Sequence, residues 1–319
     1  MIVTLTANPS LDRTVRLEGA LLPGGVHRIA TDITGPGGKG INVALGVHRA
    51  GLDVLAVFPA PDADPLPALL DDEALPYRAV PSPGKVRTNI TVVSDPDVTT
   101  KINEPGTPLA ASDVRAVEEA LSGAVGPGDT VMLSGSLAPG FPVDEYATLV
   151  RRLRAQGAWV GVDTSDAPLA ALFAAGADAA PDFLKPNAEE LGQLTGGDGA
   201  ELEAMVAAGD REQVVAAARA LHAQGVGDVL VTLGGSGAIL VTAEGAWYSP
   251  SPPVEVASTV GAGDSATAGY LIGRATGAGP AERLALSVAY GSVAVSLPGT
   301  TIPSRTQVTP NVDVVVVLP

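Results

Sequence analysis

The second part of the sequence alternates between two kinds of segment, and this alternation restricts the possible folds most strongly. From about residue 129, short apolar runs that end in turn residues occur as DTVMLSG, AWVGVD, FLKPN and DVLVTLG, which is the pattern of buried strands. Between them, segments 143–157 and 211–225 carry apolar residues at helical spacing and end in glycine, as helices do. Alternating strands and helices predict an α/β fold with a mainly parallel central sheet and helices on both faces.

The first third of the sequence has a different pattern. VRTNITVVS, residues 86–94, alternates apolar and polar residues, and DPDV followed by TTKINEP continues it, which predicts a hairpin with one exposed face. Such a hairpin is a candidate lid over a pocket; the alternative is a surface hairpin without a role in binding. At the other end of the chain, VTPNVDVVVVLP predicts a further strand.

Length and charge limit the classes of function. The 319 residues, of which 46% are hydrophobic, suit one large domain over residues 1–319. The net charge of -16 argues against nucleic acids and anionic membranes as partners. Residues 1–103 carry a net charge of -2 and the remainder -14, so an anionic ligand is expected to bind near the first third. With no basic leader, no long apolar span and no cysteine, a cytoplasmic location is expected.

A glycine-rich turn precedes a predicted helix at residues 35–51, GPGGKGINVALGVHRAG. Backbone N–H groups at such a helix start can bind an anion or sugar hydroxyls, and Lys39 adds a positive charge. The segment is not a Walker A loop, because Gly40 and Ile41 follow the lysine where that motif needs Ser or Thr. The alternative is a tight turn without a ligand.

Other polar residues follow predicted strands, where α/β folds bind their ligands. Asp12 in TANPSLD can accept hydrogen bonds from sugar hydroxyls, or it forms an Asx turn. Ser136 in LSGSLAPG can donate a hydrogen bond. In KPNAEEL, Asn187 and Glu190 have the spacing of a capping box, which is an alternative to a role in organising Mg²⁺.

Two further features concern phosphates and metals. TLGGSGA, residues 232–238, lies between two apolar runs, and it either seats the phosphates of a nucleotide or is only the turn of a hairpin. The three histidines, His27, His48 and His222, are not at metal-binding spacing.

The stretch TVGAGDSATAGY, residues 259–270, places Asp264 directly behind a Gly-Ala-Gly turn at a helix start. Gly261, Gly263 and Ala266 match a dinucleotide-binding fingerprint, but no strand follows and the acid would repel a pyrophosphate. A second interpretation is that the amides of Ala262, Gly263 and Asp264 stabilise a transferring phosphoryl group while the Asp264 carboxylate acts as general base. A third is that Asp264 caps the helix.

Six of these segments occur in an order that resembles one family. TANPSLD, GGKGINVA, SGSLAPG, KPNAEEL, TLGGSGA and TVGAGDSATAGY are similar to the motifs of the PfkB, or ribokinase-like, carbohydrate kinases, and most similar to the branch of 1-phosphofructokinase and tagatose-6-phosphate kinase. The resemblance implies a ribokinase-like αβα sandwich with a β-sheet lid formed by segments at about 11–34 and 84–106, ATP with Mg²⁺, and a homodimer through the lid.

The resemblance also assigns roles to residues. Asp264 would be the base, with Gly261, Ala262, Gly263 and Asp264 forming the anion hole. The sugar phosphate would contact Asp12, Gly37, Gly38, Lys39, Asn42, Arg87, Lys101, Asn103 and Ser136. The nucleotide would contact Lys185, Asn187, Thr232, Gly234 and Gly237, and Glu190 would hold Mg²⁺ through water. One departure is that no Gly-x-Asp-x-x-Gly segment is found near AVFPAPDADPLPALL, so that edge of the pocket is expected to differ.

The activity implied is phosphorylation of a ketohexose monophosphate, with D-fructose 1-phosphate as the first choice and tagatose 6-phosphate or fructose 6-phosphate as alternatives. Two hypotheses lie outside this class. One is an NAD-dependent oxidoreductase, which needs a strand–helix–strand around Gly261. The other is a non-catalytic sugar-phosphate sensor, which would need a broken transfer site.

Overall fold

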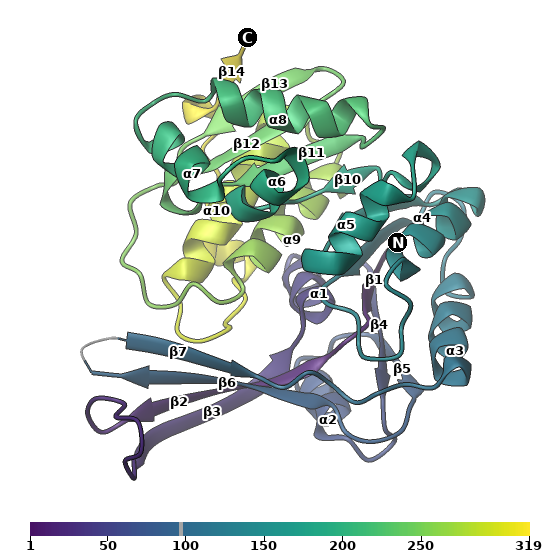
Figure 1. Cartoon of the computed structure of the whole chain (residues 1–319), viewed down its shortest axis with the longest axis vertical. Helices are drawn as coiled ribbons and strands as arrows, with labels where there is room; N and C mark the ends of the chain where they lie inside the picture. Colours follow the sequence, from purple (N-terminus) through teal and green to yellow (C-terminus); the bar gives the residue numbers. More distant parts are fainter. Residues whose placement is uncertain (96–97) are drawn as a thin grey trace.

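The computed structural model describes residues 1–95 and 98–319 and contains two β-sheets (Figure 1). The large sheet has ten strands in the order β14-β13-β12-β11-β10-β9-β8-β1-β4-β5, and the small sheet has four in the order β3-β2-β6-β7. Helices lie on both faces of the large sheet. The predicted α/β fold with a small β-sheet lid is therefore confirmed.

Most strands of the large sheet are parallel, and those at one end are antiparallel. The parallel strands are β1 (Ile2–Thr6), β4 (Val54–Ala60), β5 (Tyr77–Pro81), β8 (Thr130–Ser134), β9 (Trp159–Asp163), β10 (Phe183–Leu184) and β11 (Asp228–Thr232). The antiparallel strands are β12 (Ala238–Thr242), β13 (Gly245–Ser249) and β14 (Val316–Leu318). Each of the four apolar runs predicted as strands contains one of β8 to β11, and the predicted C-terminal strand is β14.

Two hydrophobic clusters cover the two faces of the large sheet. Alternate residues of one strand belong to different clusters, as Val131 and Leu133 belong to one and Met132 to the other, because side chains alternate across a strand. One cluster packs against α3 (Ala111–Ser122), α4 (Glu145–Ala155), α5 (Asp166–Ala174), α6 (Ala188–Thr195), α7 (Gly199–Ala207) and α8 (Glu212–Ala223). The other packs against α1 (Lys39–Arg49), α2 (Pro65–Asp72), α9 (Ala262–Ala275) and α10 (Pro280–Val295).

The small sheet extends away from the helices at the lower left of Figure 1. It consists of β2 (Ser10–Leu17), β3 (Ile29–Gly37), β6 (Arg87–Ser94) and β7 (Val98–Asn103). Strands β6 and β7 pair antiparallel, as the alternating pattern predicted. The turn predicted at DPDV includes residues 96 and 97, which lie outside the described residues. We call this sheet the lid.

The parallel strands place their carboxyl ends at one edge of the large sheet, beside the lid. The segments after β1, β8, β9, β10 and β11 therefore lie next to one another, which is where open α/β sheets bind ligands. Among the helices of the described residues, none has the length and apolar character needed to cross a bilayer.

Candidate active site

A cavity of about 1080 Å³ lies at this edge of the sheet. It is lined by residues of the lid, of the strand ends and of α9 and α10. Of the residues predicted from the sequence, the cavity is lined by Asp12, Gly38, Lys39, Asn42, Arg87, Lys101, Lys185, Asn187, Glu190, Thr232, Gly234, Gly237, Gly261, Ala262, Gly263 and Asp264. The other three do not line it: Gly37 packs under Asp12, Asn103 is exposed on the lid, and Ser136 accepts a hydrogen bond from Asn8.

Helix α9 begins at the cavity with free N–H groups. Its N-cap is Gly261, whose φ of 78° is left-handed and suits glycine, and no side chain of the described residues caps the helix. The N–H groups of Ala262, Gly263 and Asp264 are the first of the helix and lack acceptors within it. Because α9 is followed by α10 without an intervening strand, the dinucleotide-binding interpretation of this turn is excluded.

Asp264 does not cap the helix and is instead held by a side chain of the neighbouring helix α1. Its Oδ2 accepts a hydrogen bond of 2.8 Å from Asn42 Nδ2 on α1, and both side chains are buried. Burial raises the pKa of Asp264 to about 6; nearby Asp163 adds to this shift, and Lys39, Asn42 and Lys185 oppose it. A carboxyl group with this pKa is ionised at neutral pH and is suited to accept a proton.

Asp163, at the end of β9, joins two lysines. Its Oδ1 lies 2.8 Å from Lys39 Nζ and its Oδ2 lies 3.3 Å from Lys185 Nζ. Burial alone would raise the pKa of Asp163, but Lys185 and Lys39 hold it below the usual value. Burial also opposes the charge on Lys39, yet Asp163 and Asp264 raise its pKa. The ammonium group of Lys39 is therefore kept charged beside Asp264.

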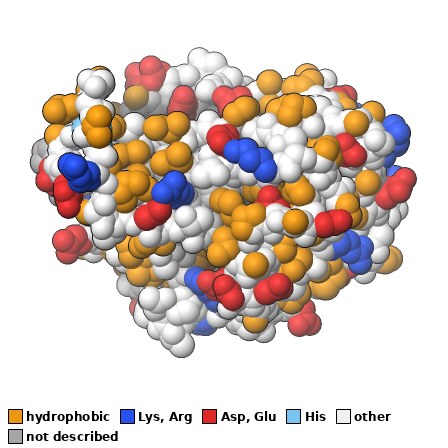
Figure 2. All heavy atoms as spheres, turned by 90° about the horizontal axis from the view of Figure 1, so that it is seen from below, with side chains coloured by type: hydrophobic (Ala, Val, Ile, Leu, Met, Phe, Trp, Pro, Cys, Tyr) orange, Lys and Arg blue, Asp and Glu red, His pale blue; other side chains and the backbone are white. Residues whose placement is uncertain are grey.

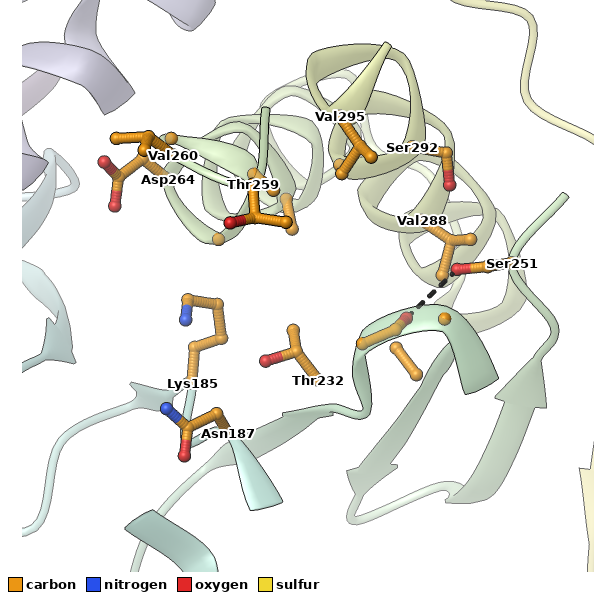
Figure 3. Close-up of a pocket in the computed structure, with 18 of the residues that line it drawn as sticks. Lys185, Asn187, Thr232, Ser251, Thr259, Val260, Asp264, Val288, Ser292 and Val295 are labelled. Atoms are coloured by element: carbon orange, nitrogen blue, oxygen red, sulfur yellow. Dashed lines mark hydrogen bonds between the residues drawn. The ribbon is translucent and has the colours of Figure 1, made fainter. Parts of the chain in front are cut away.

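Lys185 lies beside the first turn of α9. A Cβ placed on Gly263 would be 3.4 Å from Lys185 Nζ, so the ammonium group and the free N–H groups of α9 meet at one place. This arrangement of a helix N-terminus and a cation suits an anion such as a phosphoryl group. In Figure 3, Lys185 and Asp264 lie on the same side of the cavity, with Lys185 below Asp264.

The carboxylate of Asp12 is anchored within the lid. Its Oδ1 accepts hydrogen bonds from Ser10 Oγ at 2.8 Å and from Asn89 Nδ2 at 3.1 Å. A Cβ on Gly37 would lie 2.3 Å from Asp12 Cγ, so the close approach of β3 requires glycine. Burial raises the pKa of Asp12, with Ser10, Asn89 and Arg87 opposing the shift.

The other end of the cavity is lined by apolar and small side chains. Val288, Ser292 and Val295 of α10 lie opposite the β11–β12 turn (Figure 3). Residues 232–238 form the turn between β11 and β12, which pair antiparallel. The turn also lines the cavity, and Ser251 Oγ donates to the carbonyl of Gly234. A cavity with a charged end and an apolar end suits a ligand that carries phosphates on a flat apolar group.

Glu190 was predicted to hold Mg²⁺ or to cap a helix, and the cap is present. Asn187 Oδ1 accepts from the N–H of Glu190 at 2.8 Å, and Glu190 Oε2 accepts from the N–H of Asn187 at 2.9 Å. Glu190 also lines the cavity, so its carboxylate fits a cation that prefers oxygen ligands. No group of three or more His, Cys, Asp or Glu that could hold a metal occurs in residues 1–95 and 98–319; a Mg²⁺ ion here would keep waters and phosphate oxygens as ligands.

Several residues of this site were not predicted from the sequence. Asp163 ends the apolar run AWVGVD, so an acid at the carboxyl end of a predicted strand was a usable signal. Asn89 occupies a polar position of the alternating strand 86–94, next but one to Arg87. The segment 251–256 and α10, which line the apolar end, carried no signal of binding.

Comparison with known proteins identifies the family. The model of the pfkB family carbohydrate kinases matches residues 6–307. The chain is 37% identical to a 1-phosphofructokinase of Xanthomonas campestris over 84% of this chain and 82% of the relative, and 34% identical to a 1-phosphofructokinase of Haloferax volcanii over 98% and 96%. Its fold is similar to a crystal structure of phosphofructokinase-2 from Escherichia coli in complex with substrates and products, with a TM-score of 0.87, 32% identity and coverage of 96% of each chain. The chain therefore belongs to the pfkB family of carbohydrate kinases.

Proposed function

We propose that this protein transfers the γ-phosphoryl group of ATP to a ketohexose monophosphate, with D-fructose 1-phosphate as substrate and fructose 1,6-bisphosphate as product. The observation that carries the proposal is the position of Asp264, a buried carboxylate at an uncapped helix start beside Lys185. The names of the relatives from Xanthomonas and Haloferax support the choice of the 1-phosphate.

In the reaction, the C6 hydroxyl of the sugar attacks the γ-phosphorus and its proton passes to Asp264. Since Oδ2 of Asp264 accepts from Asn42, the proton is taken by Oδ1. The bond from phosphorus to the bridging oxygen breaks and ADP leaves, while the N–H groups of residues 261–264 and Lys185 balance the charge on the phosphoryl oxygens. Mg²⁺, when bound with Glu190 near it, supplies further positive charge to the phosphates.

The two substrates occupy opposite ends of the cavity. The sugar is bound by Asp12, Gly38, Lys39 and Asn42, and its phosphate by Arg87 and Lys101 of the lid. Gly37 packs under Asp12 and Asn103 pairs with Asn89 of β6, so these two support the site from outside the cavity. ATP is bound by Lys185, Asn187, Thr232, Gly234 and Gly237, with its base at the apolar end. The charge distribution supports this placement, because the lid and α1 come from the less acidic first third.

A side-by-side assay tests the substrate. With ATP and Mg²⁺, kcat/KM is expected to be at least about tenfold higher for fructose 1-phosphate than for fructose 6-phosphate or tagatose 6-phosphate, a factor that one charge-assisted contact can supply. A preference for a 6-phosphate would reject the fructose 1-phosphate assignment and keep the role of Asp264, because a ketohexose phosphate bound end for end presents similar groups. A structure of the relative from Escherichia coli contains fructose 6-phosphate.

We also propose that the protein forms a homodimer through the lid. The lid and its loops expose Leu22, Val26, Ile29, Ile33, Val98 and Ile102, and Figure 2 shows hydrophobic side chains gathered on the left of the face seen from below, where the lid lies. Exposed apolar patches of this kind commonly mark interfaces.

A single charge in the lid tests the dimer. Ile33→Asp is expected to convert a dimer into a monomer of 31.8 kDa, because burying an unpaired carboxylate in an interface is costly; light scattering measures the mass. Val143→Asp, at a residue exposed to 51% outside the lid, should leave the mass unchanged. A monomeric wild-type protein, or a dimer that keeps its mass in the Ile33 variant, would reject the lid interface.

A further inference from the structure

The loop that follows α10 reaches the lid. Thr300 Oγ1 donates a hydrogen bond of 3.4 Å to Oδ2 of Asp12, and a Cβ on the preceding Gly299 would lie 3.4 Å from Thr14 Oγ1 of the same strand. Residues 12 and 300 are 288 positions apart in the chain. The loop therefore connects the lid to the part of the protein that carries α9 and α10.

The methyl group of the same threonine lies beside the start of α9. A Cβ on Gly261 would lie 3.3 Å from Thr300 Cγ2 and 3.5 Å from Ile302 Cδ1. Gly261 is the left-handed N-cap that sets the direction of the first N–H groups of the helix. Thr300 thus has its hydroxyl on a lid carboxylate and its methyl against the turn of the anion hole.

The two oxygens of Asp12 have different environments. Oδ1 accepts hydrogen bonds from Ser10 and Asn89, which both belong to the lid, whereas Oδ2 accepts one from Thr300, which lies outside the lid. An incoming sugar hydroxyl that donates to Oδ2 shares this oxygen with Thr300. The Thr300 hydroxyl therefore holds the orientation in which the carboxylate receives the sugar.

We propose that Thr300 is a positioning residue that couples the sugar-binding carboxylate of the lid to the anion hole at Gly261. The proposal rests on the proposed function, because it takes Asp12 as a ligand of the sugar. Its hydroxyl acts on sugar binding through Asp12, and its methyl acts on phosphoryl transfer through Gly261. The two roles are carried by different atoms, so they can be separated by substitution.

Three variants test this coupling. Thr300→Val keeps the methyl group and removes the hydroxyl, so KM for the sugar phosphate is expected to rise about three- to tenfold, the factor of one hydrogen bond, with kcat within about twofold of wild type. Thr300→Ser keeps the hydroxyl and removes the methyl, so kcat should fall about threefold or more while KM for the sugar stays near wild type. Thr301→Val is the matched control, because the Thr301 hydroxyl donates to the carbonyl of Pro298 within the loop, and it should change neither constant.

The outcomes are distinct from those that test the proposed function. An inactive wild-type enzyme with all three ketohexose phosphates would overturn the proposed function and this role with it. If the wild type is active but the Val and Ser variants are impaired in the same kinetic constant, or in neither kcat nor KM, the role of Thr300 alone is overturned. Urea unfolding of each variant shows whether a change in kcat or KM reflects loss of folded protein.

Discussion

Replacing Asp264 by asparagine is expected to lower kcat about a thousandfold, because a positioned general base typically contributes about 10²–10⁴ to the rate. The amide has the shape of the carboxylate and its oxygen can still accept from Asn42, so KM for both substrates should stay within about threefold. Steady-state kinetics of the wild type and the variant measure this. A variant with nearly wild-type kcat would show that the base is another group.

The pH dependence gives an independent check on Asp264. Because its pKa is raised to about 6, kcat/KM of the wild type should fall as the pH drops through about 6, where the base becomes protonated. The residual activity of Asp264→Asn should lack this step, whereas any step from ionisation of the sugar phosphate remains in both proteins.

The same shift predicts that the inactive variant is the more stable one. A carboxyl group whose pKa is higher in the folded state than its model value of 3.8 binds its proton more tightly when folded, so its contribution to stability is lost as the pH rises through about 6. At pH 8 the asparagine variant should therefore gain up to about 3 kcal/mol in the free energy of unfolding, and at pH 4 the gain should nearly vanish. Urea titrations at the two pH values measure it.

Replacing Asp163 by asparagine is expected to impair both substrates at once. The carboxylate holds Lys39 on the sugar side and Lys185 on the nucleotide side, and an amide offers one acceptor in place of two. We expect kcat/KM to fall about a hundredfold for the sugar phosphate and for ATP, corresponding to about 2.7 kcal/mol. A loss confined to one substrate would show that Asp163 does not connect the two lysines.

The stability of the Asp163 variant should also fall. Lys185 is exposed to only 5% and Asp163 to 0% of their side chains, and removing one partner of a buried ion pair typically costs about 3–5 kcal/mol. Asp178→Asn is the control, because Asp178 pairs with Arg151 at the surface, where such pairs contribute about 0–1 kcal/mol. Equal unfolding free energies for the two variants would contradict the buried role.

Much of the fold follows from local patterns in the sequence. The apolar segments ending at Ser134, Asp163 and Thr232 could be predicted as buried strands because each is mainly apolar and bounded by turn residues. The hairpin of the lid was predictable because one face of it is exposed to solvent, so apolar and polar residues alternate along its strands. The pairing of β2 with β6 carries no such signal, since it joins residues 77 positions apart through their backbones.

The site was predictable at positions where a residue type is unusual for a purely structural role. A glycine-rich turn ending in Asp264 conflicts with simple anion binding, and that conflict pointed to a base. Asn42 was expected to contact the sugar; its hydrogen bond to Asp264 was not predicted, because it arises only when α1 packs against α9 in three dimensions. Thr300 follows an ordinary Pro-Gly turn, and its contact with Asp12 arises only when the two ends of the chain come together.

The hydrogen bond between Asn42 and Asp264 joins residues 222 positions apart. It links the part of the chain proposed to bind the sugar phosphate to the part proposed to bind ATP. On the proposed assignment, residues 1–103 chiefly recognise the acceptor and residues 185–295 the donor. The proposed base, Asp264, belongs to the second part and contacts the first through Asn42. Substitutions in the first hundred residues can therefore change which sugar is phosphorylated while the donor machinery stays intact. Related kinases can then share the same ATP-binding part, and differences in the sugar-binding part alone give them different substrates.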